Sequence, residues 1–246
     1  MPILRISHYY TIVKGLHQHR CEPFFLFYLE VSRKVSTFAG EKKEKRESWR
    51  EKKAYMDKRL YIISGCNGAG KTTASYTVLP EILNCKEFVN ADEIARGLSP
   101  FNPESVSIAA GRLMLQRINE LLLADKTFSI ETTLSTRSYI NLVRKAQARG
   151  YEVRLLFFWL KTPELAKQRV AERVQNGGHN IPEDVIKRRY VLGIKNLFNI
   201  FIPDVDYWAI YDNSDTPRKI IAYGEKEQRC EIKEELLYNT IKSYVK

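Results

Sequence analysis

The sequence predicts an α/β fold in which a central parallel sheet is covered by helices. Two observations predict it. The apolar, β-branched run at 60–64 is typical of a strand buried on both faces, and a glycine-rich turn follows it. Strand-like runs then alternate with helix-like segments along the chain, which is the order that builds a parallel sheet through right-handed crossovers.

The predicted strands are short apolar runs, and two of the predicted helices begin at recognisable capping signals. Asn102 and Thr162 are each followed by Pro and Glu, which supplies an N-cap, a first-turn proline and a carboxylate near the positive helix end. Strands are expected at 60–64, 87–90, 127–131, 151–160, 206–211 and 220–223. Helices are expected at 71–83, from 102, at 137–149, at 162–177, from 182, and at 231–245.

The helix that begins at Asn102 is expected to bury one face. Its apolar residues recur near helical spacing, which predicts the side that packs on the sheet. They are Val106, Ala109, Leu113, Ile118, Leu121 and Leu122.

Composition narrows the class of protein. The 246 residues include 40 Lys and Arg against 29 Asp and Glu, a formal net charge of +11 that suits nucleotides or nucleic acids as partners. The four cysteines lack the spacing of a metal site or a disulfide framework, so a reducing, cytoplasmic location is expected. The apolar run at 24–29, which no other run exceeds in length, is far shorter than the roughly 20 residues that span a bilayer, so no membrane contact is expected.

The chain divides near Met56. Residues 1–55 carry 12 Lys and Arg against 6 Asp and Glu, and the segment 41–53 is almost entirely charged. Charge runs of this kind are typical of solvated helices and disordered tails. We therefore expect 1–55 to be a basic extension that is poorly structured or not native to the protein, and 56–246 to be the functional domain.

A glycine-rich motif carries the strongest chemical signal. Residues 65–72 match GxxxxGK[ST], the P-loop whose backbone N–H groups cradle phosphates at the start of a helix. Lys71 is expected to reach the β- and γ-phosphates, and Thr72 is expected to ligate Mg²⁺. ATP and Mg²⁺ are therefore the predicted cofactors. The predicted nucleotide-binding residues are Gly65, Cys66, Asn67, Gly68, Ala69, Gly70, Lys71, Thr72 and Thr73.

Polar residues at two other strand ends are candidates for acceptor chemistry, because ligands of open α/β sheets bind at the carboxyl ends of the strands. Asp92 follows the second strand and suits either a general base for a substrate hydroxyl or the N-cap of a short helix over 93–97. Arg96, one turn further on, suits an anionic substrate group. Glu131 suits Mg²⁺, through water, or substrate hydroxyls, and its simpler interpretation is a polar strand end.

Two basic helices joined by a glycine turn predict a lid like that of nucleoside-monophosphate-kinase-like enzymes. Arg169 and Arg173 share one helix face, and Arg188 and Arg189 lie on the next helix. Such a lid closes over the nucleotide and supplies arginines to the transferred phosphoryl group. We expect Arg173 and Arg188 in this catalytic role, and a solvated basic helix pair is the alternative. The polar residues 212–214 end the fifth strand, where related folds contact the adenine.

These features together resemble the zeta-toxin family of P-loop kinases over about residues 58–245. The resemblance rests on GCNGAGKTT at 65–73, NADEIAR at 90–96, IETTLSTR at 130–137 and RVAERVQNGGHNIPEDVIKRRY at 169–190. Family members studied as toxins phosphorylate UDP-N-acetylglucosamine on a sugar hydroxyl. The resemblance therefore implies a UDP-sugar as acceptor and an antitoxin protein as partner.

The resemblance also implies roles for single residues. Asp92 matches the catalytic base of the family, and Glu131 and Thr133 match substrate-binding positions. Where the toxins place an arginine two residues beyond that threonine, this chain has Ser135, and Arg137 follows two positions later. We expect Arg137 to take over the contact, and the acceptor's identity stays open at this point.

The leading interpretation is an ATP-dependent kinase that phosphorylates a UDP-sugar, with UDP-N-acetylglucosamine as the first candidate. One alternative is a kinase for another small acceptor, such as a nucleoside, a sugar or an antibiotic. Another is a polynucleotide kinase or nucleic-acid-binding ATPase that uses the basic extension. Residues 56–246 carry 28 Lys and Arg against 23 Asp and Glu, a modest excess, so nucleic acid is not the expected partner.

Overall fold

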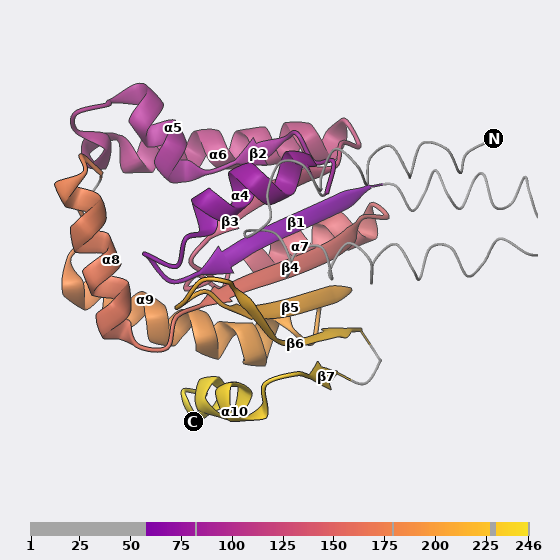
Figure 1. Ribbon diagram of the computed structural model, residues 1–246. Coiled ribbons are helices and arrows are strands. Elements are labelled where there is room, and N and C mark those ends of the chain that lie inside the picture. The colour runs from indigo at the N-terminus through magenta and orange to yellow at the C-terminus, as the bar shows by residue number, and fades with distance from the viewer. Residues whose placement is uncertain (1–57, 82, 179, 227–229, 246) are drawn as a thin grey trace, which may run out of the picture.

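The computed structural model describes residues 58–81, 83–178, 180–226 and 230–245, so the predicted extension at 1–55 lies outside the described residues. These residues form a seven-stranded sheet in the order β2-β3-β1-β4-β5-β6-β7 (Figure 1). The strands are β1 (Arg59–Gly65), β2 (Phe88–Val89), β3 (Phe128–Thr132), β4 (Glu152–Trp159), β5 (Tyr207–Asp212), β6 (Lys219–Glu225) and β7 (Glu231–Ile232).

Strand β1 lies at the centre of the parallel part of the sheet. Ile62 pairs with Ile130 of β3 on one side and with Leu155 of β4 on the other. Every residue of β1 after Arg59 is buried, as expected for a strand with both faces covered. Strand β2 extends this arrangement beyond β3, and β5 extends it beyond β4. The predicted central parallel sheet is therefore confirmed.

The far edge of the sheet is antiparallel, which the alternating sequence pattern does not predict. Residues 213–218 join β5 to β6 directly, and a parallel neighbour would need a crossover of a dozen or more residues. The two strands therefore run in opposite directions, and Tyr207, the first residue of β5, pairs with Glu225, the last residue of β6. The predicted closing helix over 231–245 is wrong at its start, because residues 231–232 pair with β6 as β7.

Helices lie on both sides of the sheet, and α8 and α9 extend beyond the carboxyl ends of its parallel strands as the predicted lid (Figure 1). The hydroxyl of Thr162 accepts the Leu165 N–H at 3.1 Å, so the predicted N-cap of α8 is confirmed. The helices are α4 (Lys71–Glu81), α5 (Ala91–Leu98), a 3₁₀ turn η1 (Pro103–Val106), α6 (Ser107–Leu123), α7 (Tyr139–Ala148), α8 (Pro163–Gln175), α9 (Glu183–Asn196) with its π-helical continuation η2 (Leu197–Phe201), and α10 (Glu235–Ser243).

The buried face of α6 differs from the prediction. Ala109 and Leu113 are exposed, whereas Ala110 and Met114 pack into the core with Ile118, Leu121 and Leu122. The reason is helical geometry within α6, because Ala110 and Met114 share a row four residues apart with Ile118 and Leu122, whereas Ala109 and Leu113 lie one position, about 100°, away from that row. The Asn102 side chain makes no cap hydrogen bond, and the next four residues are 3₁₀-helical.

Among the described residues, no helix is both long enough and apolar enough to cross a membrane.

Candidate active site

The P-loop connects the central strand β1 to helix α4. Gly68 and Gly70 adopt φ angles of 78° and 73°, a left-handed conformation that glycine enters without a steric penalty. The Lys71 side chain is only 7% exposed, and its Nζ donates to the Cys66 carbonyl at 2.9 Å. Local sequence therefore builds a closed loop with a buried ammonium group at a helix N-terminus, a place suited to an anion.

Glu131, at the end of β3, contacts both functional side chains of the P-loop. The Thr72 hydroxyl donates to its two carboxylate oxygens at 3.1 and 2.9 Å, and Lys71 Nζ lies 3.8 Å from Oε1. Burial raises the pKa of the Glu131 carboxyl, and the charge of Lys71 and the hydrogen bond from Thr72 partly oppose this rise. The predicted residues Lys71, Thr72 and Glu131 thus meet at one point.

Helix α5 begins directly after β2 and holds Asp92 at its start. Asn90 is the N-cap, since its Oδ1 accepts the backbone N–H of Asp92 at 2.8 Å. The interpretation of Asp92 as N-cap is therefore wrong, because the cap lies two residues earlier. Asp92 is exposed, and Arg96 pairs with Glu93 on the same helix at 3.3 Å.

The lid brings one arginine into the electrostatic field of these groups. Arg173 on α8 is half-buried, and burial lowers the pKa of its guanidinium. The negative charges of Asp92 and Glu131 act in the opposite direction, whereas the nearby Arg96 lowers the pKa further. Arg173 therefore lies within charge-interaction range of both candidate carboxylates, as a lid arginine over the site should.

The second lid helix contacts the P-loop through a residue that sequence reasoning did not select. Arg189 Nη1 donates to Asn67 Oδ1 at 3.4 Å, whereas the predicted Arg188 is exposed on α9. Neighbouring helix positions point about 100° apart, so only one of two adjacent arginines faces the loop. The sequence carries no signal that chooses between them.

The loop after β5 packs on the other side of the P-loop. Asn213 donates through Nδ2 to the Ala69 carbonyl at 2.7 Å and accepts from Arg218 Nε at 2.5 Å. Arg169 of α8 donates to the carbonyls of Asn213 and Ser214 at 2.8 and 2.7 Å. Sequence reasoning expected adenine contact from residues 212–214, and the structure adds that Asn213 supports the P-loop itself.

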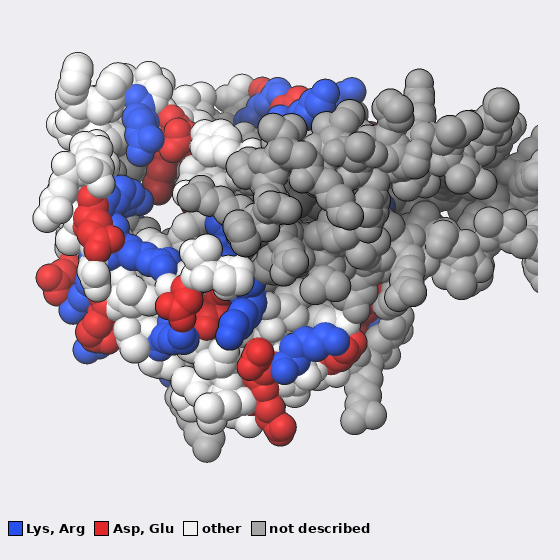
Figure 2. All heavy atoms as spheres, in the orientation of Figure 1, with Lys and Arg blue, Asp and Glu red and all other residues white. Residues whose placement is uncertain are grey.

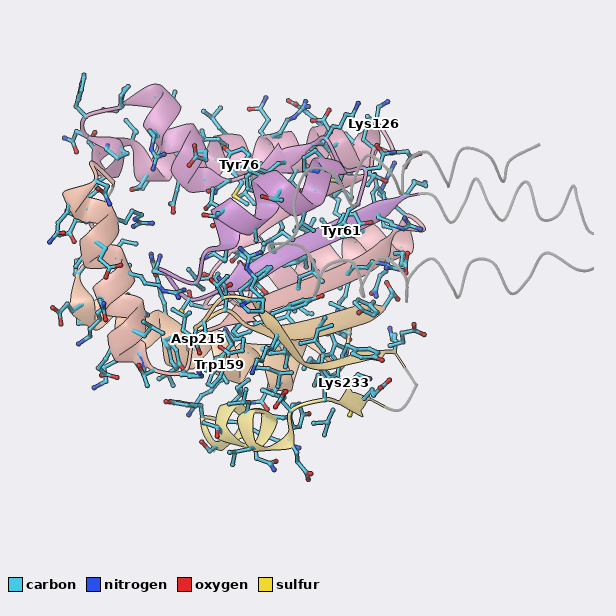
Figure 3. The ribbon with its side chains drawn as sticks, viewed as in Figure 1. Tyr61, Tyr76, Lys126, Trp159, Asp215 and Lys233 are labelled. Atoms are coloured by element: carbon cyan, nitrogen blue, oxygen red, sulfur yellow. The ribbon has the colours of Figure 1, made fainter. Side chains whose placement is uncertain are left out.

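This loop lies at the sheet end that carries the site. Figure 3 shows Trp159, the last residue of β4, and Asp215 close together near helix α8, with Lys126 at the opposite end of the sheet. The carboxyl ends of the parallel strands therefore collect the candidate groups, as expected for an open α/β fold.

The remaining predicted substrate residues follow β3. Thr133 and Ser135 are partly buried, with their hydroxyl oxygens 2.9 Å apart. Arg137 is exposed and lies two residues before α7. Figure 2 shows basic and acidic side chains interspersed around the opening between the α5 and α8 segments.

The residues at the P-loop fit Mg²⁺. Thr72 and Glu131 offer hard oxygen donors side by side, and Mg²⁺ binds through few protein oxygens, with phosphates and waters completing its shell. No cluster of three or more His, Cys, Asp or Glu suited to a metal occurs in the part of the chain that the structure describes. A nucleotide-borne magnesium ion suits this site better than an all-protein cage.

Comparison with known proteins adds a family and a set of similar folds. Residues 45–215 match the Zeta toxin family, a match that begins within the predicted extension. An uncharacterized protein of Haemophilus influenzae is 30% identical over 141 residues, which cover 57% of this chain and 99% of that protein.

Two solved structures share the fold at low sequence identity. A chain of the AvrRxo1-ORF1:AvrRxo1-ORF2 complex with sulphate ions is similar with a TM-score of 0.64 and 16% identity, over 76% of this chain and 64% of that one. A chain from the PezAT toxin–antitoxin system of Streptococcus pneumoniae has a TM-score of 0.54 and 18% identity, over 92% of this chain and 89% of that one. This chain therefore spans about two thirds of the AvrRxo1 chain and most of the PezAT chain.

Proposed function

Because this chain belongs to the zeta toxin family of P-loop kinases, we propose that it transfers the γ-phosphate of ATP to a hydroxyl group of a UDP-sugar. The first candidate acceptor is UDP-N-acetylglucosamine. The kinase domain in this proposal is 56–246. The observation that carries the proposal is the meeting of Lys71, Thr72 and Glu131 at one point. The charges of Asp92 and Glu131 also act on the lid residue Arg173.

The P-loop side of the site binds and orients the phosphates. Lys71, which donates to the Cys66 carbonyl at 2.9 Å, would hold the phosphate oxygens, and the Thr72 hydroxyl, which donates to Glu131, would hold Mg²⁺. Mg²⁺ held there would neutralise negative charge on the phosphates. Glu131 keeps its carboxylate at the edge of this arrangement and holds the metal's water or a substrate hydroxyl.

The opposite side of the site serves the acceptor. Asp92 is exposed at the start of α5, free of the capping role that Asn90 fills, and accepts the proton of the attacking hydroxyl. Arg173 stabilises the negative charge on the transferred phosphoryl group, and Arg96 suits the diphosphate of a UDP-sugar. Thr133 and Arg137 complete the acceptor side. This chain has Ser135 where the family toxins have an arginine, and Arg137 takes over the contact of that arginine.

An antitoxin partner is part of the same proposal. The PezAT neighbour belongs to a toxin–antitoxin system, and this chain covers 89% of that chain. We therefore propose that a second protein holds this kinase inactive in its host, and that the kinase expressed alone arrests growth.

The test is a transfer reaction with purified full-length protein, magnesium-ATP and a panel of acceptors, read by mass spectrometry. The panel contains UDP-N-acetylglucosamine, other UDP-sugars, nucleosides, free sugars, an aminoglycoside and a 5′-hydroxyl oligonucleotide. We expect a singly phosphorylated UDP-sugar, and Lys71→Ala should lower its rate by about 10²-fold or more because the phosphates lose their cation. The matched control is Lys126→Ala, which removes an exposed lysine at the opposite end of the sheet (Figure 3).

Transfer to another member of the panel would overturn the UDP-sugar assignment and leave the phosphotransfer chemistry in place. Equal transfer by wild type and Lys71→Ala would overturn the P-loop as the catalytic site. Oligonucleotide phosphorylation with a steep salt dependence would favour a polynucleotide kinase instead.

A further inference from the structure

Asn90 lies between the metal side and the acceptor side of the site. It is the residue between β2 and α5, and its side chain is only 6% exposed. Its Nδ2 donates to Glu131 Oε2 at 3.0 Å, and its Oδ1 accepts the backbone N–H of Asp92 at 2.8 Å. One buried amide therefore contacts the carboxylate beside the metal-binding hydroxyl and the first turn of the helix that carries the base.

From these contacts we propose that Asn90 is a positioning residue that holds Glu131 for the metal and Asp92 for the acceptor hydroxyl. The proposal rests on the function proposed above, because Asp92 is a base only in that reaction. Asn90 itself touches neither reactant in it. Its effect passes through the two residues that do.

Only an amide satisfies both contacts. The carboxylate of Glu131 needs a donor, and the Asp92 N–H needs an acceptor, so the amide orientation follows from its partners. A serine hydroxyl caps the helix but is too short to also reach Glu131. An aspartate caps the helix but places a second carboxylate against Glu131, whose pKa burial already raises.

The contact to Glu131 gains importance when magnesium binds. Among the described residues, Thr72 and Asn90 donate hydrogen bonds to the Glu131 carboxylate, and Lys71 lies at ion-pair distance. In the proposed reaction both P-loop residues would hold the nucleotide and its metal instead. Asn90 then remains as the neutral donor that fixes the carboxylate without cancelling its charge. Substituting a residue that holds a metal ligand in this way typically lowers metal affinity or activity by about 10- to 100-fold.

The contact to Asp92 sets the start of α5. An N-cap side chain fixes the first turn by satisfying one of its free N–H groups. Asp92 is itself in that turn, so losing the cap loosens the backbone that positions its carboxylate. The two contacts can be separated, because serine keeps the cap and alanine keeps neither.

The experiment compares Asn90→Ser and Asn90→Ala in the full-length protein. ATP binding is measured by calorimetry across a magnesium titration and in EDTA, with no acceptor present. We expect Asn90→Ser to raise the magnesium concentration needed for half-maximal ATP affinity by about tenfold, with ATP binding in EDTA unchanged. Asn141→Ser, the same substitution on an exposed face of α7, should leave the titration unchanged.

A double-mutant cycle separates positioning from a general loss of structure. If Asn90 acts through Glu131, then Asn90→Ser should no longer change the magnesium titration in a Glu131→Gln background. A shift that persists in full in that background would overturn the metal part of the proposal, and so would a wild-type titration for Asn90→Ser. Melting temperatures measured alongside show whether each variant is folded.

The transfer assay tests the second contact. Asn90→Ala should have a lower kcat than Asn90→Ser, with the same KM for ATP, because only alanine loses the cap beneath Asp92. Equal kcat values would overturn the acceptor part of the proposal. The magnesium titration needs no acceptor, so an incorrect UDP-sugar assignment would leave the metal result standing and show itself only in the transfer assay.

Discussion

The P-loop draws its functional groups from consecutive residues, whereas the lid reaches the same site with side chains from two separate helices. In the P-loop, Lys71 and Thr72 are adjacent, and the glycine conformations at 68 and 70 are local. In the lid, Arg173 belongs to α8, and the residue that contacts Asn67 is Arg189 on α9. A local motif can be recognised from residue types alone, but which lid arginine is useful depends on how the helices pack.

The sharpest test of this comparison is an alanine series along the lid. Arg173→Ala should lower kcat by about 10³-fold, because a lid arginine stabilises charge on the transferred group. Arg189→Ala should have a smaller effect, mainly on the KM for ATP, since it contacts the P-loop. Arg188→Ala should have the smallest effect of the three, because that side chain is exposed. Lys187→Ala, also exposed on α9, is the matched surface control.

A larger loss for Arg188→Ala than for Arg173→Ala would reverse the assignment. It would mean that α9 rotates when the nucleotide binds and brings Arg188 inwards. Steady-state kinetics with saturating acceptor, together with melting temperatures, distinguish this outcome from unfolding.

The same contrast explains what the sequence could predict. The P-loop, the parallel sheet and the lid helices were predictable because each leaves a local or periodic pattern. The N-cap at Asn90 was missed because Asp92 is an equally good capping residue by type. The buried Met114 was missed because the prediction took the neighbouring Leu113, which lies about 100° around the helix from it.

Long-range partners were the least predictable part of the site. The bond from Asn213 to the Ala69 carbonyl joins residues 144 positions apart, and the bond from Asn90 to Glu131 spans 41. Nothing in the residue types encodes these pairings, because each depends on the strand order of the sheet. The P-loop motif was therefore predictable from the sequence, whereas the distant residues that hydrogen-bond to the site were not.

Cysteine labelling tests whether the P-loop is as closed as the structure indicates. Burial raises the pKa of the Cys66 thiol from 9.0 to about 11, although the nearby charge of Lys71 acts in the opposite direction. The thiolate is the reactive form, so below pH 9 its fraction at Cys66 is about 100-fold lower than in the unfolded chain. We expect iodoacetamide at pH 8 to modify the exposed Cys230 and to spare Cys66 until urea unfolds the protein.

Peptide mass spectrometry resolves the two sites in the same sample. The reactivity of Cys66 should rise as pH approaches 11, since its raised pKa delays ionisation. Equal labelling of Cys66 and Cys230 at pH 8 would show that the P-loop opens readily. The contrast between a closed, locally specified loop and a lid assembled by packing would then be lost.

A pair of glycine substitutions gives the smallest and most closely matched test. Gly70 in the P-loop and Gly177 in the lid turn have φ angles of 73° and 78°, so alanine meets the same left-handed strain at both. A Cβ at Gly70 would lie 2.7 Å from Asn213 Nδ2, whereas one at Gly177 meets nothing within 4 Å. Gly177→Ala should therefore cost about 1 kcal/mol, roughly 2–4 °C in melting temperature, and leave ATP affinity unchanged.

Gly70→Ala should show the same strain and, in addition, about tenfold weaker ATP binding, or roughly 1.4 kcal/mol. The extra loss arises because Asn213 must move, and it then releases the Ala69 carbonyl that it holds within the P-loop. Gly111→Ala, in open space on α6, controls for the substitution itself. Equal ATP affinities for Gly70→Ala and Gly177→Ala would mean that Asn213 does not support the loop, and the P-loop would then depend on its own motif alone.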